Sequence, residues 1–428
     1  MNPRAAAVGL LLALEERGGF ANLVLSDEAL GEAGKDAPFL TALFYGAVER
    51  RLTLDYAACA LSARSEKDLT PHTRALLHIG LYQIYFMRIP AHAAVGETVA
   101  LAKNKGEAAF VNAVLRRAAT SSLPLPPEGR RARYLSVKES FPLPTVRRFI
   151  ELYGEAETEA LLSAFNAPHP LSLTVNTLRI SVEALGERFT EAGLRWERGA
   201  YSPLTVKVWG SPPPTALPGF AEGLFFVQDE ASAVAALALA PREGDRILDV
   251  CAAPGGKSMA AAVLAKGKGE GFAFDLHESK LSLIKENAAR LGLSLRVAAL
   301  DAVTGDASLD GTADRVICDV PCSGLGVLGK KADLRYRESG DDLAPLGYDI
   351  LCRSARYLKK GGARVYSTCT LLPEENGENV NRFLAEHKDF ALEEFAVGEA
   401  KSESGQLTLL PHKHGTDGFF VCRLRRVL

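Results

Sequence analysis

Two cysteines stand in sequence contexts that favour covalent chemistry. Cys322 lies in the run 319–324 (Asp-Val-Pro-Cys-Ser-Gly) and Cys369 in the run 366–370 (Tyr-Ser-Thr-Cys-Thr). A short β-rich apolar segment precedes each run, so both thiols are expected where a strand of an α/β sheet ends, the place where such sheets bind ligands. A thiol is intrinsically nucleophilic and partly ionised near neutral pH, which suits it to adding to an electron-poor pyrimidine ring. The pair therefore suggests chemistry on a nucleic-acid base.

A glycine-rich turn upstream of both cysteines is a candidate cofactor loop. The run 249–258 reads Asp-Val-Cys-Ala-Ala-Pro-Gly-Gly-Lys-Ser, between a predicted strand and an alanine-rich predicted helix. Glycines at such a turn let a ligand approach the backbone, and the helix start offers N–H groups to a carboxylate or phosphate. A P-loop would need glycine where Cys251 stands, and the G-x-G-x-x-G pattern of dinucleotide sites is absent. These observations leave a nucleoside cofactor without phosphate.

Two aspartates that follow the next two predicted strands support this interpretation. Asp275 comes about 20 residues after the glycines, the spacing at which an acid binds ribose hydroxyls, and Asp301 is placed to receive the exocyclic amine of adenine. Either aspartate alone could equally be a helix cap. Together with the loop they favour S-adenosylmethionine. The predicted cofactor-binding residues are Cys251, Ala252, Ala253, Pro254, Gly255, Gly256, Lys257, Asp275, Asp301 and Asp319.

Composition is that of an ordinary soluble globular protein of two or three domains, with 428 residues, 47% hydrophobic and 24% charged. Seven cysteines without regular spacing do not form a disulfide framework, and no Cys/His pair complements Cys318 and Cys322 at zinc-site spacing, so no metal is predicted. No apolar run approaches the roughly 20 residues of a membrane span, and no signal peptide opens the chain. We expect a cytoplasmic protein.

Three regions differ in pattern. Residues 1–125 read as about six helices, 126–228 as linker helices followed by a small α+β module, and 229–428 as alternating strands and helices, which predicts a doubly wound, mainly parallel sheet. In the module, strands are predicted at 171–176, 205–208 and 224–227, and a helix at 182–192. In the last region, strands are predicted at 246–250, 269–274, 295–299, 315–318, 364–367 and 419–424, and helices at 278–291 and 342–358.

Charge is distributed unevenly. The first 150 residues carry 19 Lys and Arg against 14 Asp and Glu, a net +5, while the remainder carries 31 against 38, a net −7. A basic first third favours a polyanionic partner.

The motifs also carry a family resemblance. The runs Cys251–Lys257, Asp319–Gly326 and Ser367–Cys369, with Gln228–Ser232 and Asp417–Phe420, resemble those of the RNA 5-methylcytosine methyltransferases, the Nol1/Nop2/Sun family. The N-terminal runs Leu76–Gln83, Ile89–Val95 and Phe110–Arg116 resemble the NusB-type antitermination domain. This combination is similar to the bacterial Sun/Fmu branch of the family, which methylates a cytosine of 16S ribosomal RNA. The resemblance implies an all-α NusB-like bundle, a small α+β module and a C-terminal Rossmann-like class I methyltransferase domain.

The resemblance also implies roles for the reactive residues. Cytosine C5 is too weakly nucleophilic to take a methyl group until a thiolate has added at C6. DNA cytosine methyltransferases use the cysteine of the Pro-Cys motif, but this RNA family uses that of the Thr-Cys motif, which assigns the attack to Cys369 and product release to Cys322. Asp319 would hold the N3/N4 edge of the base. Two roles fit Lys257, lowering a thiol pKa or steadying the loop.

The implied partner is 16S ribosomal RNA of a small-subunit precursor, bound by a monomer, with neither DNA nor membrane as a partner. Its target must be a loop cytosine or one extruded from the stack. The chain departs from the family at Thr370, where serine is usual, and at 329–336, where the family's arginine pair and Pro-Asp are replaced and contacts to RNA are left open. The rival hypothesis is a non-enzymatic RNA-binding or assembly factor. Such a protein should have lost a cysteine, Asp319 or the glycine loop, and this chain has kept them all.

Overall fold

The computed structural model describes residues 2–17, 24–25, 27–336 and 342–427, which form two compact units. Unit 1 comprises residues 1–167 and 330–337, and unit 2 comprises residues 168–329 and 338–428. Within the described ranges, none of the helices combines the length and apolar character that crossing a membrane requires.

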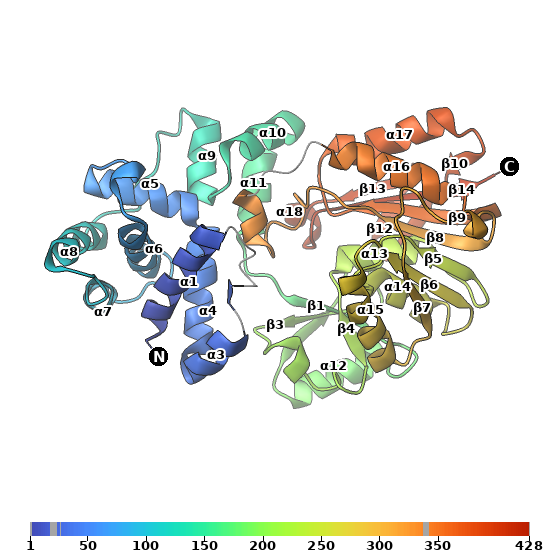
Figure 1. Ribbon diagram of the computed structural model, residues 1–428, viewed down its shortest axis with the longest axis horizontal. Coiled ribbons are helices and arrows are strands. Elements are labelled where there is room, and N and C mark those ends of the chain that lie inside the picture. The colour runs from blue at the N-terminus through green and yellow to red at the C-terminus, as the bar shows by residue number, and fades with distance from the viewer. Residues whose placement is uncertain (1, 18–23, 26, 337–341, 428) are drawn as a thin grey trace. The chain divides into compact units, whose positions relative to one another are not determined.

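Unit 1 is helical (Figure 1). Up to residue 119 its described residues form seven α-helices, where the sequence predicted about six, and three more follow the proline-rich segment 123–129. The helices are α1 (Pro3–Arg17), α3 (Asp27–Ala33), α4 (Ala37–Glu49), α5 (Arg51–Ser62), α6 (Pro71–Tyr85), α7 (Ala91–Val99), α8 (Lys105–Ala119), α9 (Arg131–Glu139), α10 (Leu143–Tyr153) and α11 (Glu155–Phe165).

Helix α6 runs through the core of the first seven helices. It begins where the Thr70 side chain accepts a hydrogen bond from the Thr73 N–H and Pro71 occupies the first turn, which is a favourable helix start. Its buried face includes Leu76, and α4 packs against it closely. A Cβ added to Gly46 of α4 would lie 1.9 Å from the Tyr82 ring, so only glycine permits this approach.

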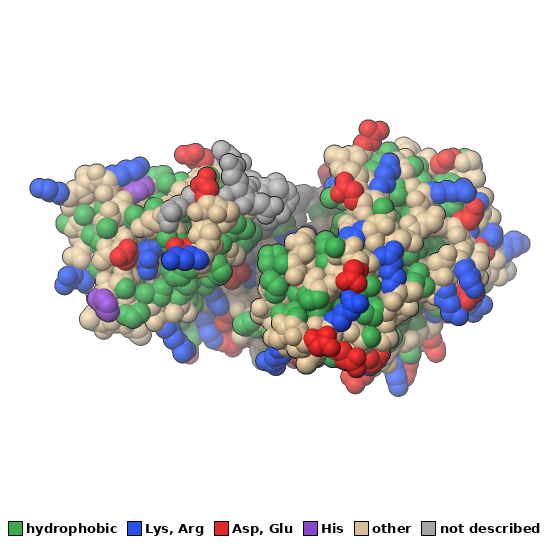
Figure 2. Space-filling view, turned by 90° about the horizontal axis from the view of Figure 1, so that it is seen from below, with side chains coloured by type: hydrophobic (Ala, Val, Ile, Leu, Met, Phe, Trp, Pro, Cys, Tyr) green, Lys and Arg blue, Asp and Glu red, His purple; other side chains and the backbone are tan. Residues whose placement is uncertain are grey.

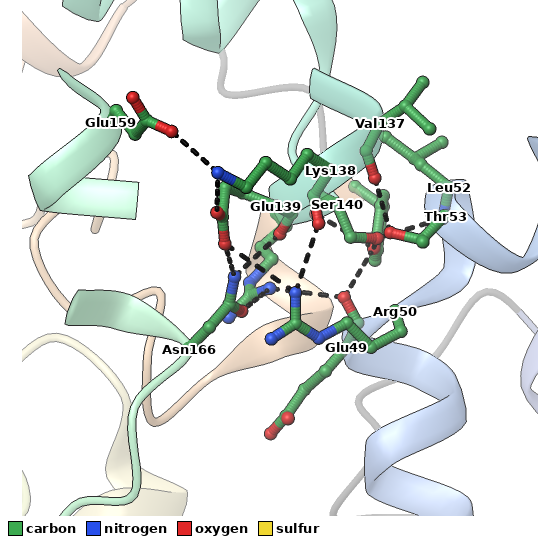
Figure 3. Close-up of polar contacts among 12 residues, drawn as sticks. Glu49, Arg50, Leu52, Thr53, Val137, Lys138, Glu139, Ser140, Glu159 and Asn166 are labelled. Carbon is green, nitrogen blue, oxygen red and sulfur yellow. Dashed lines mark hydrogen bonds and ion pairs between the residues drawn. The ribbon is translucent and has the colours of Figure 1, made fainter. Parts of the chain in front are cut away.

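Polar contacts join the region that follows the proline-rich segment 123–129 to helix α5 (Figure 3). The Thr53 hydroxyl on α5 donates to the Val137 carbonyl, and the Ser140 hydroxyl accepts from the Leu52 N–H at 3.0 Å. In the same region, Lys138 forms an ion pair with Glu159 of α11 at 2.7 Å.

The short segment 330–337 lies between two stretches of unit 2 in the sequence but folds with unit 1. It contains a 3-10 helix, η5 (Ala332–Tyr336), whose Arg335 is 2% exposed and donates to the Glu49 carbonyl at 3.2 Å and to Asn166 Oδ1 at 2.9 Å. Burial lowers the pKa of Arg335 to about 10. Lys330 and Lys331 are exposed. Of the three basic residues in the run 329–336, which differs from the family pattern, Arg335 is thus buried in the packing of unit 1.

Unit 2 begins with a small module. Its antiparallel sheet has the order β2-β3-β1-β4, and one helix, α12, follows β1. The sequence predicted three of these strands and the helix but not β2. The elements are β1 (Leu171–Val175), α12 (Val182–Glu191), β2 (Arg195–Arg198), β3 (Thr205–Trp209) and β4 (Phe225–Val227).

The larger part of unit 2 is a doubly wound sheet of order β10-β14-β9-β8-β5-β6-β7, with β13 paired to β14. Strands β9, β8, β5, β6 and β7 are parallel, and β14 is antiparallel to β9. The strands are β5 (Arg246–Asp249), β6 (Glu270–Asp275), β7 (Leu295–Ala299), β8 (Ala313–Asp319), β9 (Leu358–Thr368), β10 (Phe390–Leu392), β13 (Gln406–Leu409) and β14 (Phe419–Arg426), with a separate hairpin of β11 (Phe395–Val397) and β12 (Ala400–Ser402). The six strands predicted for this region are confirmed.

Helices cover both faces of this sheet (Figure 1). Along β8, Val316 and Cys318 pack with α16 and α17, whereas Ile317 packs with α13 on the opposite face, as the alternation of strand side chains requires. The helices are α13 (Glu230–Ala238), α14 (Gly256–Leu264), α15 (Glu278–Leu291), α16 (Leu343–Ala355), α17 (Gly377–Glu386) and the short α18 (Pro411–His414). Helix α16 ends at Ala355 rather than at the predicted residue 358, where β9 begins.

Basic side chains of unit 1 do not gather in one patch on the face shown in Figure 2. There, Lys and Arg are interspersed with acidic and apolar side chains. On this face, the Lys and Arg side chains of unit 1 are therefore dispersed.

Candidate active site

The carboxyl ends of the parallel strands bring the predicted site residues together. Strand order reverses between β5 and β8, which is the crevice where doubly wound sheets bind ligands. Asp249 ends β5, Asp275 ends β6 and Asp319 ends β8. Cys369 directly follows β9, whose Ser367 pairs in register with Asp319.

The glycine loop connects β5 to α14 in a tight turn. The Gly255 N–H donates to the Ala252 carbonyl at 2.6 Å, and Gly255 has a φ of +105°. A Cβ there would lie 2.6 Å from Met259 Cε, and the positive φ by itself favours glycine. The following Gly256 opens α14, whose first N–H groups point out of the helix start.

A cavity of about 160 Å³ lies beside this loop. Seven of the predicted cofactor-binding residues line it, namely Cys251, Ala252, Ala253, Pro254, Gly256, Lys257 and Asp319, whereas Gly255, Asp275 and Asp301 do not. The other lining residues are Val227, Gln228, Asp229, Ser232 and Asp249.

Asp275 and Asp301 occupy different settings. Asp275 is 8% exposed and accepts from the Ala253 N–H at 3.2 Å and the His277 N–H at 3.1 Å, so it braces the cofactor loop from the next strand. Asp301 follows β7 and accepts from the Val303 N–H at 2.9 Å, which closes its own turn. The structure thus joins Asp275 directly to the loop and leaves Asp301 as a local turn residue.

Asp249 is a cavity residue to which the sequence reasoning gave no role. It is 1% exposed and accepts from the Ser258 hydroxyl at 2.6 Å. Burial raises the pKa of Asp249 to about 7. Gln228, also unassigned from sequence, accepts from the Thr174 hydroxyl of β1 at 2.8 Å and connects the small module to the cavity. The signal for Gln228 was its place in a run that resembles the family, and that for Asp249 was its place at the start of the glycine-rich run 249–258.

The two thiols lie against one another. Cys322 Sγ is 3.3 Å from Cys369 Sγ, although 47 residues separate them in the chain. The hydrogen bond with Cys369, reinforced by burial, raises the pKa of Cys322 well above its usual range. Cys322 therefore holds its proton firmly and is suited to donate a hydrogen bond to its neighbour.

Lys257 and Asp319 form an ion pair between the loop and the thiols. Lys257 Nζ is 2.6 Å from Asp319 Oδ2, and the Ser367 hydroxyl donates to Asp319 Oδ1 at 2.7 Å. Lys257 Nζ also lies 5.0 Å from the Phe419 ring centroid. Both carboxylate oxygens of Asp319 thus have fixed donors, while its side chain remains 28% exposed.

No cluster of three or more metal-ligating side chains occurs within the part of the chain that the structure describes.

Comparison with known proteins identifies the family. A protein of Bacillus subtilis named "Probable ribosomal RNA small subunit methyltransferase B" is 35% identical over 446 residues, which cover 99% of this chain and 98% of the relative. The chain belongs to the 16S rRNA methyltransferase RsmB/F family. That family matches residues 236–425, the NusB family matches 1–120, and the ferredoxin-like domain of RsmF/B-like methyltransferases matches 141–211.

Other similar proteins agree with this assignment. The ribosomal RNA small subunit methyltransferase B of Pseudomonas putida is 32% identical, covering 100% of this chain and 99% of the relative. The crystal structure of PH0851 covers 99% of both chains with a TM-score of 0.81 and 26% identity. NSun6 from Pyrococcus horikoshii, solved with SFG, covers 68% of this chain and 99% of its own, with a TM-score of 0.61 and 26% identity.

Membership confirms several sequence-based predictions. The RsmB/F protein is a methyltransferase with S-adenosylmethionine as the family's cofactor, and it carries the expected NusB-like region. The ferredoxin-like match falls within the region predicted as linker helices and a small α+β module. The loop and cavity fit such a cofactor, because a glycine turn, an open helix start and the loop-bound carboxylate of Asp275 lie together.

Proposed function

We propose that this RsmB/F protein methylates C5 of a specific cytosine in 16S ribosomal RNA through a covalent bond between Cys369 and C6 of the base. The observation that carries the proposal is the pair of thiols, 3.3 Å apart, at the ends of adjacent strands and beside the cofactor loop. One nucleophile explains attack on the base, and a second thiol within contact distance explains its release. The names of the curated relatives support a small-subunit RNA as substrate.

The family resemblance assigns the roles of the two cysteines, and the raised pKa of Cys322 agrees with its part in product release. Cys369, as thiolate, adds to C6 and makes C5 nucleophilic. S-adenosylmethionine, held by the residues around Cys251–Lys257 and by Asp275, supplies an electrophilic methyl group. Water takes up the C5 proton, and the electron pair of the C6–S bond returns to Cys369 as the C5–C6 double bond re-forms. Cys322, whose raised pKa keeps it protonated, stabilises the Cys369 thiolate both before attack and as it leaves.

Asp319 is suited to binding the cytosine base as well as to lining the cofactor cavity. Its carboxylate is oriented by Lys257 and Ser367, and Asp319 ends β8, the strand that leads to Cys322. A carboxylate facing the N3/N4 edge of cytosine accepts from the exocyclic amine and stabilises the proton that N3 takes up on thiolate addition. This orientation also gives Lys257 the role of steadying Asp319.

Methylation of unmodified 16S RNA tests the proposal directly. The purified protein is incubated with labelled S-adenosylmethionine and either naked 16S RNA or small subunits, and the position and ring atom of the methyl group are mapped. The proposal expects 5-methylcytosine at one position. A label on another ring atom, or none with either substrate, would contradict it and, in the second case, favour an RNA-binding or assembly factor.

Asp275 gives a first prediction about the cofactor. Asp275→Ala removes an acceptor for a ribose hydroxyl and the acceptor of the Ala253 N–H, so cofactor binding should weaken by about 1.5–3 kcal/mol. Titration calorimetry with S-adenosylmethionine measures the change. Asp301→Ala is the matched variant, since its carboxylate closes only its own turn in the structure, and it should cost less. An Asp275→Ala affinity equal to that of the unmodified protein would remove Asp275 from the site.

The N-terminal region gives a second prediction. Deleting residues 1–120 should leave cofactor binding intact while lowering RNA affinity or site selection, because the loop, cavity and thiols all lie downstream. Filter binding to 16S RNA and calorimetry with the cofactor measure the two effects. The deletion also removes Glu49, whose carbonyl accepts from Arg335. The Arg335→Lys variant of the full chain therefore serves as the control for loss of this contact. Undiminished methylation efficiency and site choice in the truncated protein would assign the region another role.

A further inference from the structure

The loops that carry the two thiols are tied together by the residues next to them. Ser323 follows Cys322 and Thr370 follows Cys369, and their side-chain oxygens lie 2.6 Å apart. This hydrogen bond crosses between the ends of β8 and β9 at the level of the thiol pair. Each cysteine thus has a neighbour that holds the opposite loop.

A buried carboxylate completes this connection. Glu375, 4% exposed in the 3-10 helix Pro373–Glu375, accepts from the Ser323 N–H at 2.8 Å and from the Thr370 hydroxyl at 3.4 Å. Its backbone carbonyl accepts from the Tyr366 hydroxyl at 2.6 Å, which fixes the 3-10 helix against β9. One side chain therefore contacts both thiol loops.

The next residue holds the other flank of Cys369. Asn376 Oδ1 accepts from the Thr368 hydroxyl at 2.5 Å, and Asn376 Nδ2 donates to the Thr370 carbonyl at 3.0 Å. The backbone is thereby fixed immediately before and immediately after Cys369. The Cys322 loop is joined to this backbone by the Gly326 N–H, which donates to the Cys369 carbonyl at 2.8 Å, while Glu375 bonds to both loops beside the thiols.

We propose that Glu375 is a positioning residue that sets the contact between the Cys322 and Cys369 thiols. It acts through Ser323 and Thr370 rather than on substrate, and it belongs to neither the cofactor loop nor its cavity. The proposal rests on the proposed function only for its catalytic consequence, because the thiol contact itself is a property of the protein without RNA. A buried carboxylate suits this task because hydrogen bonds to a charged acceptor are stronger than neutral ones.

Oxidation of the thiol pair measures this geometry without RNA. Diamide takes up two electrons and two protons, becoming the hydrazine, while the two thiols lose them and join as a disulfide. The rate of Cys322–Cys369 disulfide formation is followed by mass spectrometry of the mapped peptides. We expect rapid formation in the unmodified protein and a rate about ten- to a hundredfold lower in Glu375→Ala, the equivalent of losing one hydrogen bond to a charged group.

Two other variants make the comparison specific. Glu375→Gln can still accept from the Ser323 N–H and donate to the Thr370 hydroxyl, so it should oxidise within about threefold of the unmodified rate, less than the loss of one hydrogen bond to a charged group. Glu378→Ala removes an exposed carboxylate from the first turn of α17 and should leave the rate unchanged. Should Glu375→Ala fail to fold, Thr370→Val removes the hydroxyl that joins Glu375 to Ser323 and should slow oxidation in its place.

Methylation kinetics supply the second measurement. Glu375→Ala should lower kcat by a factor similar to its loss in oxidation rate and leave the KM for S-adenosylmethionine unchanged, with Glu375→Gln restoring kcat. Unaltered oxidation in both Glu375→Ala and Thr370→Val would overturn the positioning role, whatever the methylation result. Slow oxidation of Glu375→Ala, together with absence of methylation even in the unmodified protein, would support the positioning role and contradict the proposed function.

Discussion

Replacing Cys369 by Ala is expected to abolish methyl transfer and the covalent RNA adduct together, whereas replacing Cys322 by Ala is expected to trap the adduct. Cys369→Ala offers no thiolate for C6, so the reaction cannot begin. Cys322→Ala keeps the nucleophile and allows attack and methyl transfer, but it lacks the proton-bearing thiol 3.3 Å away that would stabilise the departing Cys369. The stalled complex should survive denaturing electrophoresis as an RNA–protein band.

The assay distinguishes this assignment from the one in which the two cysteines have exchanged roles. Labelled 16S RNA is incubated with each variant and S-adenosylmethionine, and the retarded band is tested for protein and for the methyl label. The double variant, with both cysteines replaced by Ala, controls for adventitious cross-linking and should give no band. A trapped, methylated complex with Cys369→Ala and none with Cys322→Ala would reverse the roles and assign the attack to the Pro-Cys cysteine.

The reactive side chains were predictable because short runs place them at strand ends. Asp319-Val-Pro-Cys322 and Ser367-Thr-Cys369 follow apolar strands, and parallel neighbours carry such ends to one edge of a sheet. The sequence also predicted the glycine turn, which the φ of +105° at Gly255 explains. Local pattern and parallel topology were sufficient for these residues.

Pairing across the site was not predictable in the same way. The sequence left two roles open for Lys257, and only the fold shows that its ammonium lies 2.6 Å from Asp319, 62 residues away. Asp249 received no role because its burial, which raises its pKa to about 7, depends on how α14 covers the end of β5. Such contacts depend on tertiary packing, which single-sequence periodicity does not encode.

The same limit applies to the segments that depart from regular alternation. Strand β2 is exposed along most of its length and carries arginines at both ends, so it lacks the apolar alternation that predicts a strand. The run 329–336 contains three cations whose contacts to RNA the sequence left open, and in the structure one of them, Arg335, packs over the Phe141 ring at 4.1 Å inside unit 1. Charge alone cannot distinguish a solvated arginine from a buried one.

Asp319→Asn is expected to lower kcat by about 10²- to 10⁴-fold, the usual contribution of a positioned acid–base group. The amide is nearly isosteric and can still accept from Lys257 or Ser367, but it lacks the negative charge that stabilises the proton on N3 of the adduct. The loss should therefore appear already at adduct formation, measured as the rate at which the trapped band accumulates when Asp319→Asn is combined with Cys322→Ala.

Ser367→Ala is the matched control for orientation rather than charge. It removes only the hydroxyl that donates to Asp319 Oδ1 and leaves the Lys257 ion pair, so kcat should fall by about ten- to a hundredfold, as expected for one hydrogen bond to a charged group. Calorimetry of S-adenosylmethionine binding shows whether either variant has lost activity through damage to the cofactor cavity, which Asp319 lines. If Asp319→Asn formed adduct as fast as its Cys322→Ala parent, the carboxylate would have no part in activating the base, and the Lys257–Asp319 pair would serve to hold the cofactor loop against β8.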